Sequence, residues 1–168
     1  MFPLLTFDDD AWPEATATAL TAFAEEVGPE LVEAERDGRF PREIYEEMGR
    51  RGWVGPITPR THGGLGAGVP EYCFLLEEGG RHGLVSPQVS IQGQRWLLDW
   101  GSDEQVGQYL EGIARGEIIF SESISEPGAG SSLKTMRSTA TPDGDDWILE
   151  GHKTHVNLGA ESEVTLMY

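Results

Sequence analysis

Side chains capable of nucleophilic or metal chemistry are few in this sequence and are not clustered. The four histidines, His62, His82, His152 and His155, form no metal-ligand pattern, and Cys73 is the only cysteine. A single cysteine cannot form an internal disulfide, and no cysteine or histidine spacing resembles a zinc site. We therefore expect no metal and a reducing compartment, by default the cytoplasm, with Cys73 as a small core residue.

Two glycine-rich segments offer backbone chemistry instead. The cluster Gly63–Gly68 invites comparison with a phosphate cradle, but it follows no apolar strand, lacks the Lys-Ser/Thr of a P-loop and has no dinucleotide-binding spacing. Glycines and prolines over residues 52–68 are too dense for a helix or a strand, so these residues are predicted to form an extended loop. Within that loop we favour a tight turn over a phosphate site.

The second segment, Ser125–Ser131, reads Ser-Glu-Pro-Gly-Ala-Gly-Ser. Gly128 and Gly130 allow close approach to the backbone, and Pro127 stiffens the turn. The serines at the two ends offer hydroxyls that carry no charge. Such a segment acts through positioned hydrogen-bond donors rather than through covalent chemistry.

Charge and composition exclude several classes of function. The 168 residues include 12 basic and 29 acidic side chains, which gives a net charge of −17. A surface this negative repels phosphate backbones and anionic lipid, so we expect no nucleic-acid or membrane-surface binding. No apolar stretch approaches the roughly 20 residues of a membrane-spanning helix. Residues Met1–Asp10 lack the basic region and the apolar run of a signal peptide.

The elements that must position these segments are predicted to be helical up to Gly116. Apolar residues at spacings of three and four predict a surface helix over residues 14–34. Proline is tolerated in a first helical turn, and Ser102-Asp103-Glu104-Gln105 is typical of a capping box. Further helices are therefore predicted to begin at Pro41, Pro70, Pro87 and Ser102. We infer an all-α N-terminal domain over residues 1–116.

The pattern changes after Gly116. Short β-branched and aromatic runs at residues 118–120, 147–149 and 164–168 predict strands, and Pro142-Asp143-Gly144 predicts a turn. So few short strands leave unpaired edges and no closed core. Residues 117–168 are therefore predicted to be part of an antiparallel β-domain, and the fold class is α+β.

Five landmarks, taken in order, resemble the acyl-CoA dehydrogenase family. They are Phe40-Pro41-Arg42-Glu43, Pro59–Gly66, Gly101–Gln105, Ser125–Ser131 and Glu150-Gly151-His152-Lys153. The resemblance covers essentially all of residues 1–168. It implies the family's N-terminal helical domain plus the first half of its middle, β-barrel-like domain, with the family's C-terminal helical bundle absent from this chain.

The resemblance implies FAD as the cofactor. In the family, the stretch matching Glu122–Ser131 lies along the flavin. Here it implies cofactor contacts from Glu122, Ser123, Ile124, Ser125, Gly130 and Ser131, with Ser131 also near the substrate. A second implied contact comprises His155, Val156 and Asn157.

This second contact departs from the family pattern. Family members usually carry an aromatic residue, and then a Thr or Ser, where this sequence has His155 and Asn157. An imidazole can stack on a ring and an amide can donate a hydrogen bond, so flavin binding remains compatible with both residues. The alternative is that they are surface residues of a sheet that no longer holds flavin.

The function implied is that of an N-terminal portion or subunit of a flavin-dependent acyl-thioester dehydrogenase. The substrate would be an acyl thioester of coenzyme A or acyl carrier protein, dehydrogenated at its α and β carbons by a homo- or hetero-oligomer. The family's catalytic carboxylate lies in the absent bundle, so we assign no catalytic residue here and expect activity to require that bundle or a partner chain. We expect Glu122 and Glu126 to be solvated charges.

Two alternatives remain open, because one fold supports several chemistries. In the first, the same scaffold carries out a different flavin reaction, such as oxidation of a hydroxyacyl thioester or hydroxylation with oxygen. In the second, the chain is a non-catalytic subunit that has lost the flavin site. The unusual His155 and Asn157 keep both alternatives under consideration.

Overall fold

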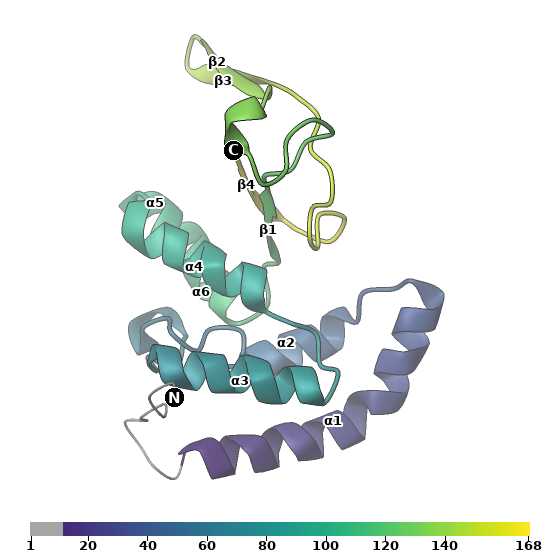
Figure 1. The fold of residues 1–168 in the computed structure, drawn as a ribbon. Coiled ribbons are helices and arrows are strands. Elements are labelled where there is room, and N and C mark those ends of the chain that lie inside the picture. Colours follow the sequence, from purple (N-terminus) through teal and green to yellow (C-terminus); the bar gives the residue numbers. More distant parts are fainter. Residues whose placement is uncertain (1–11) are drawn as a thin grey trace, which may run out of the picture. The chain divides into compact units, whose positions relative to one another are not determined.

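The computed structural model describes residues 12–168, which belong to two compact units (Figure 1). The helical unit extends to Ile118, and the strand unit, Ile119–Tyr168, contains all the strands of the described residues. A helical unit followed by a small, partial β region confirms the predicted α+β fold class. The prediction that Met1–Asp10 is not a signal peptide lies outside the described residues.

Helix α1 (Trp12–Asp37) is the predicted surface helix, extended at both ends. Its buried stripe includes Leu20, Phe23 and Ala34, spaced as the sequence pattern requires. Pro29 lies inside the helix, where a proline has no N–H to donate and its ring crowds the preceding turn. Accordingly, α1 changes direction along its length (Figure 1).

Three further helices begin within one residue of the predicted prolines: α2 (Arg42–Arg50), α3 (Val69–Arg81) and α4 (Gln88–Trp100). The Tyr45 hydroxyl of α2 donates to Ser90 Oγ of α4 at 2.7 Å, and both residues are fully buried. Burial raises the pKa of Tyr45 to about 12, although the hydrogen bond to Ser90 opposes the shift. This bond joins two helices through the core.

The prediction for Cys73 is wrong, because this residue is exposed. The buried residues of α3 include Glu71, Leu75 and Gly79, which recur every four positions. Cys73 lies midway between Glu71 and Leu75 and is therefore on the opposite side of the helix. Apolar character alone did not distinguish the two faces.

The last helical stretch of the unit consists of α5 (Asp103–Gln105), a π-helical segment η2 (Val106–Leu110) and α6 (Glu111–Ala114). Its predicted capping box is confirmed. The Gln105 N–H donates to Ser102 Oγ at 3.2 Å, and the Ser102 N–H donates to Gln105 Oε1 at 3.0 Å. These two bonds satisfy backbone donors that the first helical turn leaves free.

Residues 52–68 form the predicted loop, which contains a short 3-10 turn, η1 (Arg60–His62). The N–H groups of Leu65 and Gly66 donate to carbonyl oxygens within residues 55–58, at 3.0 and 2.8 Å. These N–H groups form hydrogen bonds within the protein and are not directed at a ligand. The glycine-rich stretch is therefore the tight turn that we favoured over a phosphate cradle.

The strand unit contains two separate pairs of strands. β2 (Thr139–Asp143) and β3 (Asp146–Glu150) are antiparallel, as predicted, whereas β1 (Phe120–Ser123) and β4 (Val164–Met167) are parallel. The parallel pair is possible because about forty intervening residues, including the 3-10 turn η3 (Leu133–Thr135), provide the return crossover. Antiparallel pairing was therefore predicted correctly for one of the two pairs.

The largest differences from the predicted strands are at β1 and β2. β1 begins at Phe120, two residues later than predicted, and β2 was not predicted as a strand at all. The sequence signal Pro142-Asp143-Gly144 does mark a turn, since Gly144 has a φ of 65°, but Pro142 still belongs to β2. Proline lacks an N–H and is tolerated only where the ladder does not need that donor, as on an edge strand.

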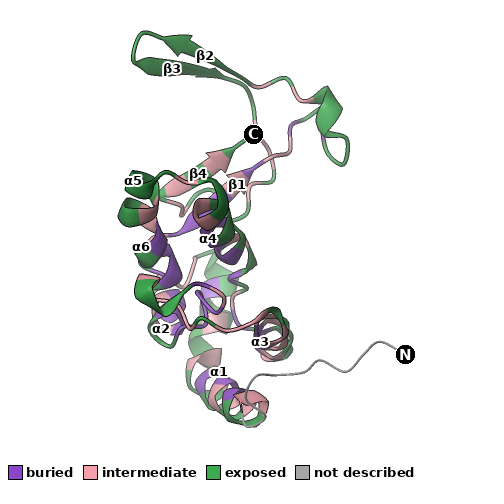
Figure 2. Cartoon of the chain, turned by 90° about the vertical axis from the view of Figure 1, so that its left-hand side faces the viewer, coloured by how far each residue is buried: buried purple, intermediate pink, exposed green. Residues whose placement is uncertain are grey.

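Burial differs between the two strand pairs (Figure 2). β1 is mostly buried, whereas every residue of β2 and β3 is exposed, including Trp147 at 63%. An antiparallel hairpin normally buries one apolar face. The exposed apolar residues of β3 are therefore consistent with a partial β region.

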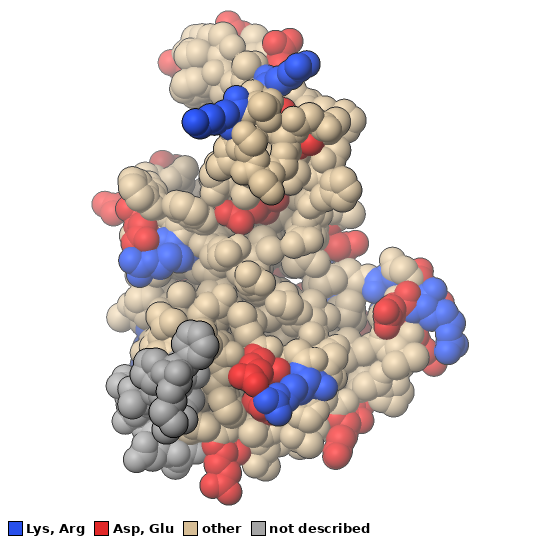
Figure 3. Space-filling view, in the orientation of Figure 1, with Lys and Arg blue, Asp and Glu red and all other residues tan. Residues whose placement is uncertain are grey.

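Charged side chains form small mixed groups on the face drawn in Figure 3. Carboxylates lie beside many of the arginines. Ion pairs of the helical unit include Arg51 with Glu47 at 2.8 Å and Arg95 with Asp99 at 2.6 Å. This face therefore presents no continuous basic patch. None of the helices in residues 12–168 is both long and apolar enough to span a membrane.

Candidate functional site

The segment Ser125–Ser131, here called the small-residue turn, is held by its own backbone. The Glu126 N–H donates to the Ala129 carbonyl oxygen at 2.8 Å, and the Ala129 N–H donates back at 3.1 Å. The hydroxyl of Thr135, in η3, donates to the Gly128 carbonyl oxygen at 3.0 Å. The turn is therefore braced from within and from the following 3-10 turn.

The glycines of this turn are not explained by the protein alone. Neither Gly128 nor Gly130 has a positive φ, so the backbone conformation does not require glycine at either position. A Cβ at either position would have no described atom within 4 Å, so packing does not require glycine either. Without side chains at these two positions, a ligand can approach the main chain of the turn closely.

Glu126 is buried and paired, so its prediction as a solvated charge is wrong. Its side chain is 6% exposed, and its carboxylate lies 2.9 Å from Lys153 Nζ. The same carboxylate accepts the N–H groups of Arg137 at 2.7 Å and Ser138 at 2.9 Å. A lone carboxylate in the sequence could not reveal these partners, which lie 11 to 27 residues further along the chain.

These contacts change the acidity of Glu126. The Ser138 hydroxyl, the Lys153 ammonium group and the two backbone amides all lower the pKa of Glu126, to about 2. The buried Ser138 hydroxyl meets no partner at full hydrogen-bond geometry among the described residues. The hydrogen bonds from Lys153 and from the two backbone amides are therefore the causes of the lowered pKa that the geometry shows directly. Glu126 is a carboxylate at every physiological pH.

Lys153 joins the small-residue turn to the chain that follows β3. Its ammonium group donates to Glu126 Oε1 at 2.9 Å and to the Ile124 carbonyl oxygen at 3.2 Å. The N–H of the next residue, Thr154, donates to the Ser125 carbonyl oxygen at 2.8 Å. These bonds place the two sequence-predicted segments side by side within the strand unit.

Sequence reasoning recognised Lys153 only as a landmark and missed its role as a partner. It is one of two lysines in the chain, with Lys134, and it follows shortly after the apolar run 147–149. A rare lysine next to an apolar strand is a candidate buried cation, and a buried cation needs an acidic partner. That signal was present, but it did not identify which carboxylate would be the partner.

The predicted residues of the first segment differ in accessibility. Glu122 and Ser123 lie in β1, where Glu122 accepts the Tyr168 hydroxyl at 3.2 Å and the Ser123 carbonyl oxygen accepts the Tyr168 N–H at 3.2 Å. Ser123 is 4% exposed. The others become progressively more accessible along the chain: Ile124 and Ser125 are half-buried, and Gly130 and Ser131 are exposed.

The second predicted segment has an unusual backbone. His155 has a φ of 55° and Leu158 a φ of 57°, a left-handed conformation that costs a non-glycine residue about 1–2 kcal/mol. His155 and Asn157 are exposed, and Val156 between them is half-buried. Backbone strain of this kind persists where surrounding structure imposes it and is frequent at ligand sites.

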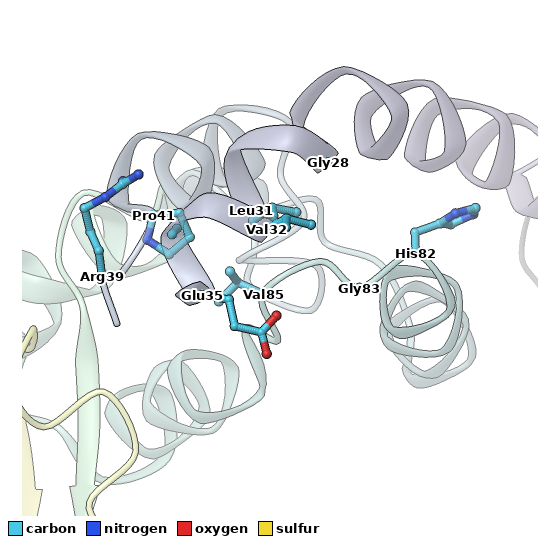
Figure 4. A pocket seen from close by; sticks show the side chains of 10 residues that line it. Gly28, Leu31, Val32, Glu35, Arg39, Pro41, His82, Gly83 and Val85 are labelled. Atoms are coloured by element: carbon cyan, nitrogen blue, oxygen red, sulfur yellow. The ribbon is translucent and has the colours of Figure 1, made fainter. Parts of the chain in front are cut away.

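The helical unit contains a pocket of about 470 Å³ (Figure 4). Leu31, Val32 and Glu35 of α1 contribute to its lining, together with Arg39 and His82. Two of its polar groups are already engaged, because Arg39 pairs with Glu30 at 2.7 Å and the His82 ring lies 3.1 Å from a threonine hydroxyl. None of the sequence-predicted site residues lines this pocket.

Comparison with protein families assigns both units. The family description "Acyl-CoA dehydrogenase, N-terminal domain" matches residues 13–117, and "Acyl-CoA dehydrogenase, middle domain" matches residues 121–168. Together these matches account for most of the chain and include the small-residue turn and Lys153. The order of the two domains is the order implied by the sequence landmarks.

Individual relatives agree with the family match. The chain is 32% identical to the long-chain specific acyl-CoA dehydrogenase of Sus scrofa mitochondria, over 86% of this chain and 34% of that protein. It is 38% identical to 3-(aryl)acrylate reductase of Clostridium sporogenes, over 87% of this chain and 40% of that protein. The chain thus spans a third to two fifths of these relatives.

Solved structures give the same answer. A chain of the ChsE4-ChsE5 complex from Mycobacterium tuberculosis matches with a TM-score of 0.85 and 31% identity, over 97% of this chain and 43% of that one. Glutaryl-CoA dehydrogenase from Mycobacterium smegmatis matches with a TM-score of 0.82 and 27% identity, over 98% and 43%. Family profiles, relatives and fold agree, and this chain belongs to the acyl-CoA dehydrogenase family.

Proposed function

We propose that this chain supplies the flavin-facing part of an FAD-dependent dehydrogenase that acts on acyl thioesters of coenzyme A or acyl carrier protein. One observation carries the proposal. The segments 122–131 and 153–157 are distant in sequence, yet three hydrogen bonds from Lys153 and Thr154, to Ile124, Ser125 and Glu126, hold them together. These are the two segments that the family resemblance assigns to the flavin.

The chemistry of the available donors fits the polar edge of a flavin. Among the described residues, no hydrogen-bond partner is present for the hydroxyls of Ser125 and Ser131 or for the side chains of His155 and Asn157. The bare backbone at Gly128 and Gly130 gives access to the main chain beside these groups. All of these donors suit a ring that needs hydrogen bonds rather than a formal counter-ion.

We therefore assign FAD to nine residues in the two segments. The first segment contributes Glu122, Ser123, Ile124, Ser125, Gly130 and Ser131, and the second contributes His155, Val156 and Asn157. In this arrangement, Ser131 is exposed and also borders the substrate. When bound, the flavin would accept a hydride from the β carbon of the acyl group. Hydroxyl and backbone N–H donors of the turn would stabilise negative charge on the ring by electrostatic preorganisation.

We assign no proton acceptor to the described residues. Glu126 is the carboxylate within the small-residue turn, but its pKa of about 2 makes it a weak base. It is also held by Lys153 and by two backbone amides. We propose that the carboxylate that removes the α proton lies outside these 168 residues, in a further part of the polypeptide or in a partner chain. One structural relative is a two-protein complex by name, which supports a partner chain.

Flavin absorbance tests the proposed function. The polypeptide is purified as the cell produces it, together with any chain that co-purifies, and its visible spectrum is recorded. We expect bound FAD, and we expect anaerobic addition of a saturated acyl thioester to bleach the flavin band. Absence of flavin with every co-purified partner and with added FAD would remove the proposal and favour a non-catalytic subunit.

A second candidate is the reverse reaction, reduction of a 2,3-unsaturated acyl group. It is favoured by the 38% identity to a protein named 3-(aryl)acrylate reductase. Stopped-flow mixing of the reduced flavoprotein with a 2,3-enoyl thioester distinguishes the two directions by their relative rates. Turnover of a hydroxyacyl thioester, without turnover of a saturated one, would instead select the alternative oxidation that His155 and Asn157 leave open.

A further inference from the structure

We propose that Glu126 and Lys153 form a positioning pair that holds the small-residue turn and the segment Lys153–Asn157 together as one flavin-facing surface. The inference rests on the proposed function and extends it to two residues that do not themselves meet the ligand. Both side chains are 6% exposed. They are thus placed to act through their neighbours rather than by direct contact.

The pair is the centre of a wider set of contacts. On one side, the Glu126 carboxylate accepts the N–H groups of Arg137 and Ser138, which fixes the start of the β2 region. On the other side, Lys153 donates to the Ile124 carbonyl oxygen at 3.2 Å. One ion pair therefore connects three stretches of chain: the turn, the approach to β2 and the segment after β3.

Burial makes this connection more sensitive to the loss of one partner than a surface ion pair is. Arg51 and Glu47 are 37% and 34% exposed, so water screens their attraction and either partner is solvated when the other is removed. Glu126 and Lys153 lack that solvation. Removal of one leaves the other as a buried charge without its counter-ion, which is strongly unfavourable. Loss of either partner should therefore open the junction.

The proposed ligand-facing groups are immediate neighbours of the pair. Ser125 precedes Glu126, and His155 follows Lys153 by two residues. His155 also has a φ of 55°, a conformation that a non-glycine residue keeps only when the surrounding structure imposes it. The ion pair and the Thr154–Ser125 hydrogen bond at 2.8 Å lie directly before this position and supply that constraint.

Isosteric variants test the proposal. Lys153→Met and Glu126→Gln each remove one charge, and the double variant removes both without leaving an unpaired charge. Lys134→Met is the matched control, because it removes the chain's other lysine, which is exposed. The readouts are hydrogen exchange at the amides of Thr154 and Ser138, and titration of the purified polypeptide with FAD. Far-UV circular dichroism verifies that each variant is folded.

We expect both single variants to speed exchange at Thr154 and Ser138 and to weaken FAD binding at least tenfold, with a shifted absorption spectrum for any FAD that remains bound. The double variant should bind FAD at least as tightly as either single variant, because the two side chains act as one unit. Lys134→Met should match the wild type. A role limited to stability would lower the unfolding midpoint and speed exchange throughout residues 119–168 alike, but it would leave the spectrum of bound FAD unchanged.

The outcomes separate this inference from the proposed function. If the wild type and Lys134→Met bind FAD and the charge variants bind it equally well, the positioning pair is refuted while the proposed function stands. If the wild type binds no FAD, the proposed function fails, and with it the role of the pair toward a flavin. Unchanged exchange at Thr154 in Lys153→Met refutes the junction itself.

Discussion

The ammonium group of Lys153 lies 2.9 Å from the Glu126 carboxylate, and only 6% of either side chain is exposed. The two residues are separated by 27 positions and by the whole β2–β3 hairpin. Their pairing therefore fixes a long-range contact in a unit whose hairpin is exposed on both faces. We therefore expect the stability of this unit and the geometry of its proposed flavin surface to depend on the same ion pair.

Acid should weaken the strand unit through Glu126. The folded state lowers the pKa of Glu126 from 4.5 to about 2, so the folded state favours the carboxylate. The resulting stabilisation is complete above about pH 5 and is lost as the pH falls toward 2. Urea-unfolding midpoints, followed by NMR signals of residues 119–168, should fall over this range. Glu126→Gln should remove this part of the pH dependence; an identical acid profile in the variant would contradict the assignment.

Alkali should weaken the helical unit through Tyr45. Burial raises the pKa of Tyr45 from 10.0 to about 12, so the folded state favours the neutral phenol. The stabilisation is complete below pH 10 and is lost as the pH rises from 10 to 12. Tyr45→Phe should remove this loss of stability between pH 10 and 12. At neutral pH it should also lower the free energy of unfolding by about 1–2 kcal/mol, because the buried Ser90 hydroxyl loses its partner.

The left-handed backbone at Leu158 predicts an unusual ranking of substitutions. Leu158→Ala and Leu158→Gly both remove the side-chain contacts made beyond Cβ, but only glycine adopts a φ of 57° without strain. Leu158→Gly should therefore be more stable than Leu158→Ala by about 1 kcal/mol. Chemical denaturation of the two variants measures the difference. Greater stability of Leu158→Ala would show that this position is not strained.

The close approach at Gly49 predicts a severe effect from a single methyl group. A Cβ on Gly49 of α2 would overlap the carbonyl oxygen of Arg115, and a backbone atom cannot swing aside as a side chain does. Gly49→Ala should cost about 3 kcal/mol of unfolding free energy. Gly80→Ala is the control. Gly80 is an exposed helical residue, and a Cβ added to it would have no atom within 4 Å. This substitution should stabilise by about 0.5–1 kcal/mol.

The helical elements could be predicted because their signals are local. The apolar spacing of α1, the prolines near the starts of α2, α3 and α4, and the capping box at Ser102 each act within a few residues. Each predicted start lies within two residues of the observed one. Cys73 is the exception, because apolar character was used there without testing which face of the helix carries it.

The strand unit was less predictable because its determinants are distant in sequence. The parallel pairing of β1 with β4 requires a crossover that no local pattern encodes. The sequence predicts a solvated Glu126 for the same reason, since its partners Arg137, Ser138 and Lys153 are brought to it only by the fold. The assignment of the two flavin segments came from family resemblance, and their contact came from the structure.

The most direct test of the central claim is a map of hydrogen exchange with and without FAD. The two proposed segments, 122–131 and 153–157, should both become slower to exchange when FAD is added to the purified polypeptide. Helix α3 (Val69–Arg81) should remain unchanged and serves as the internal reference. Protection of only one segment, or protection confined to other residues, would contradict the claim that the two segments form one flavin-facing surface.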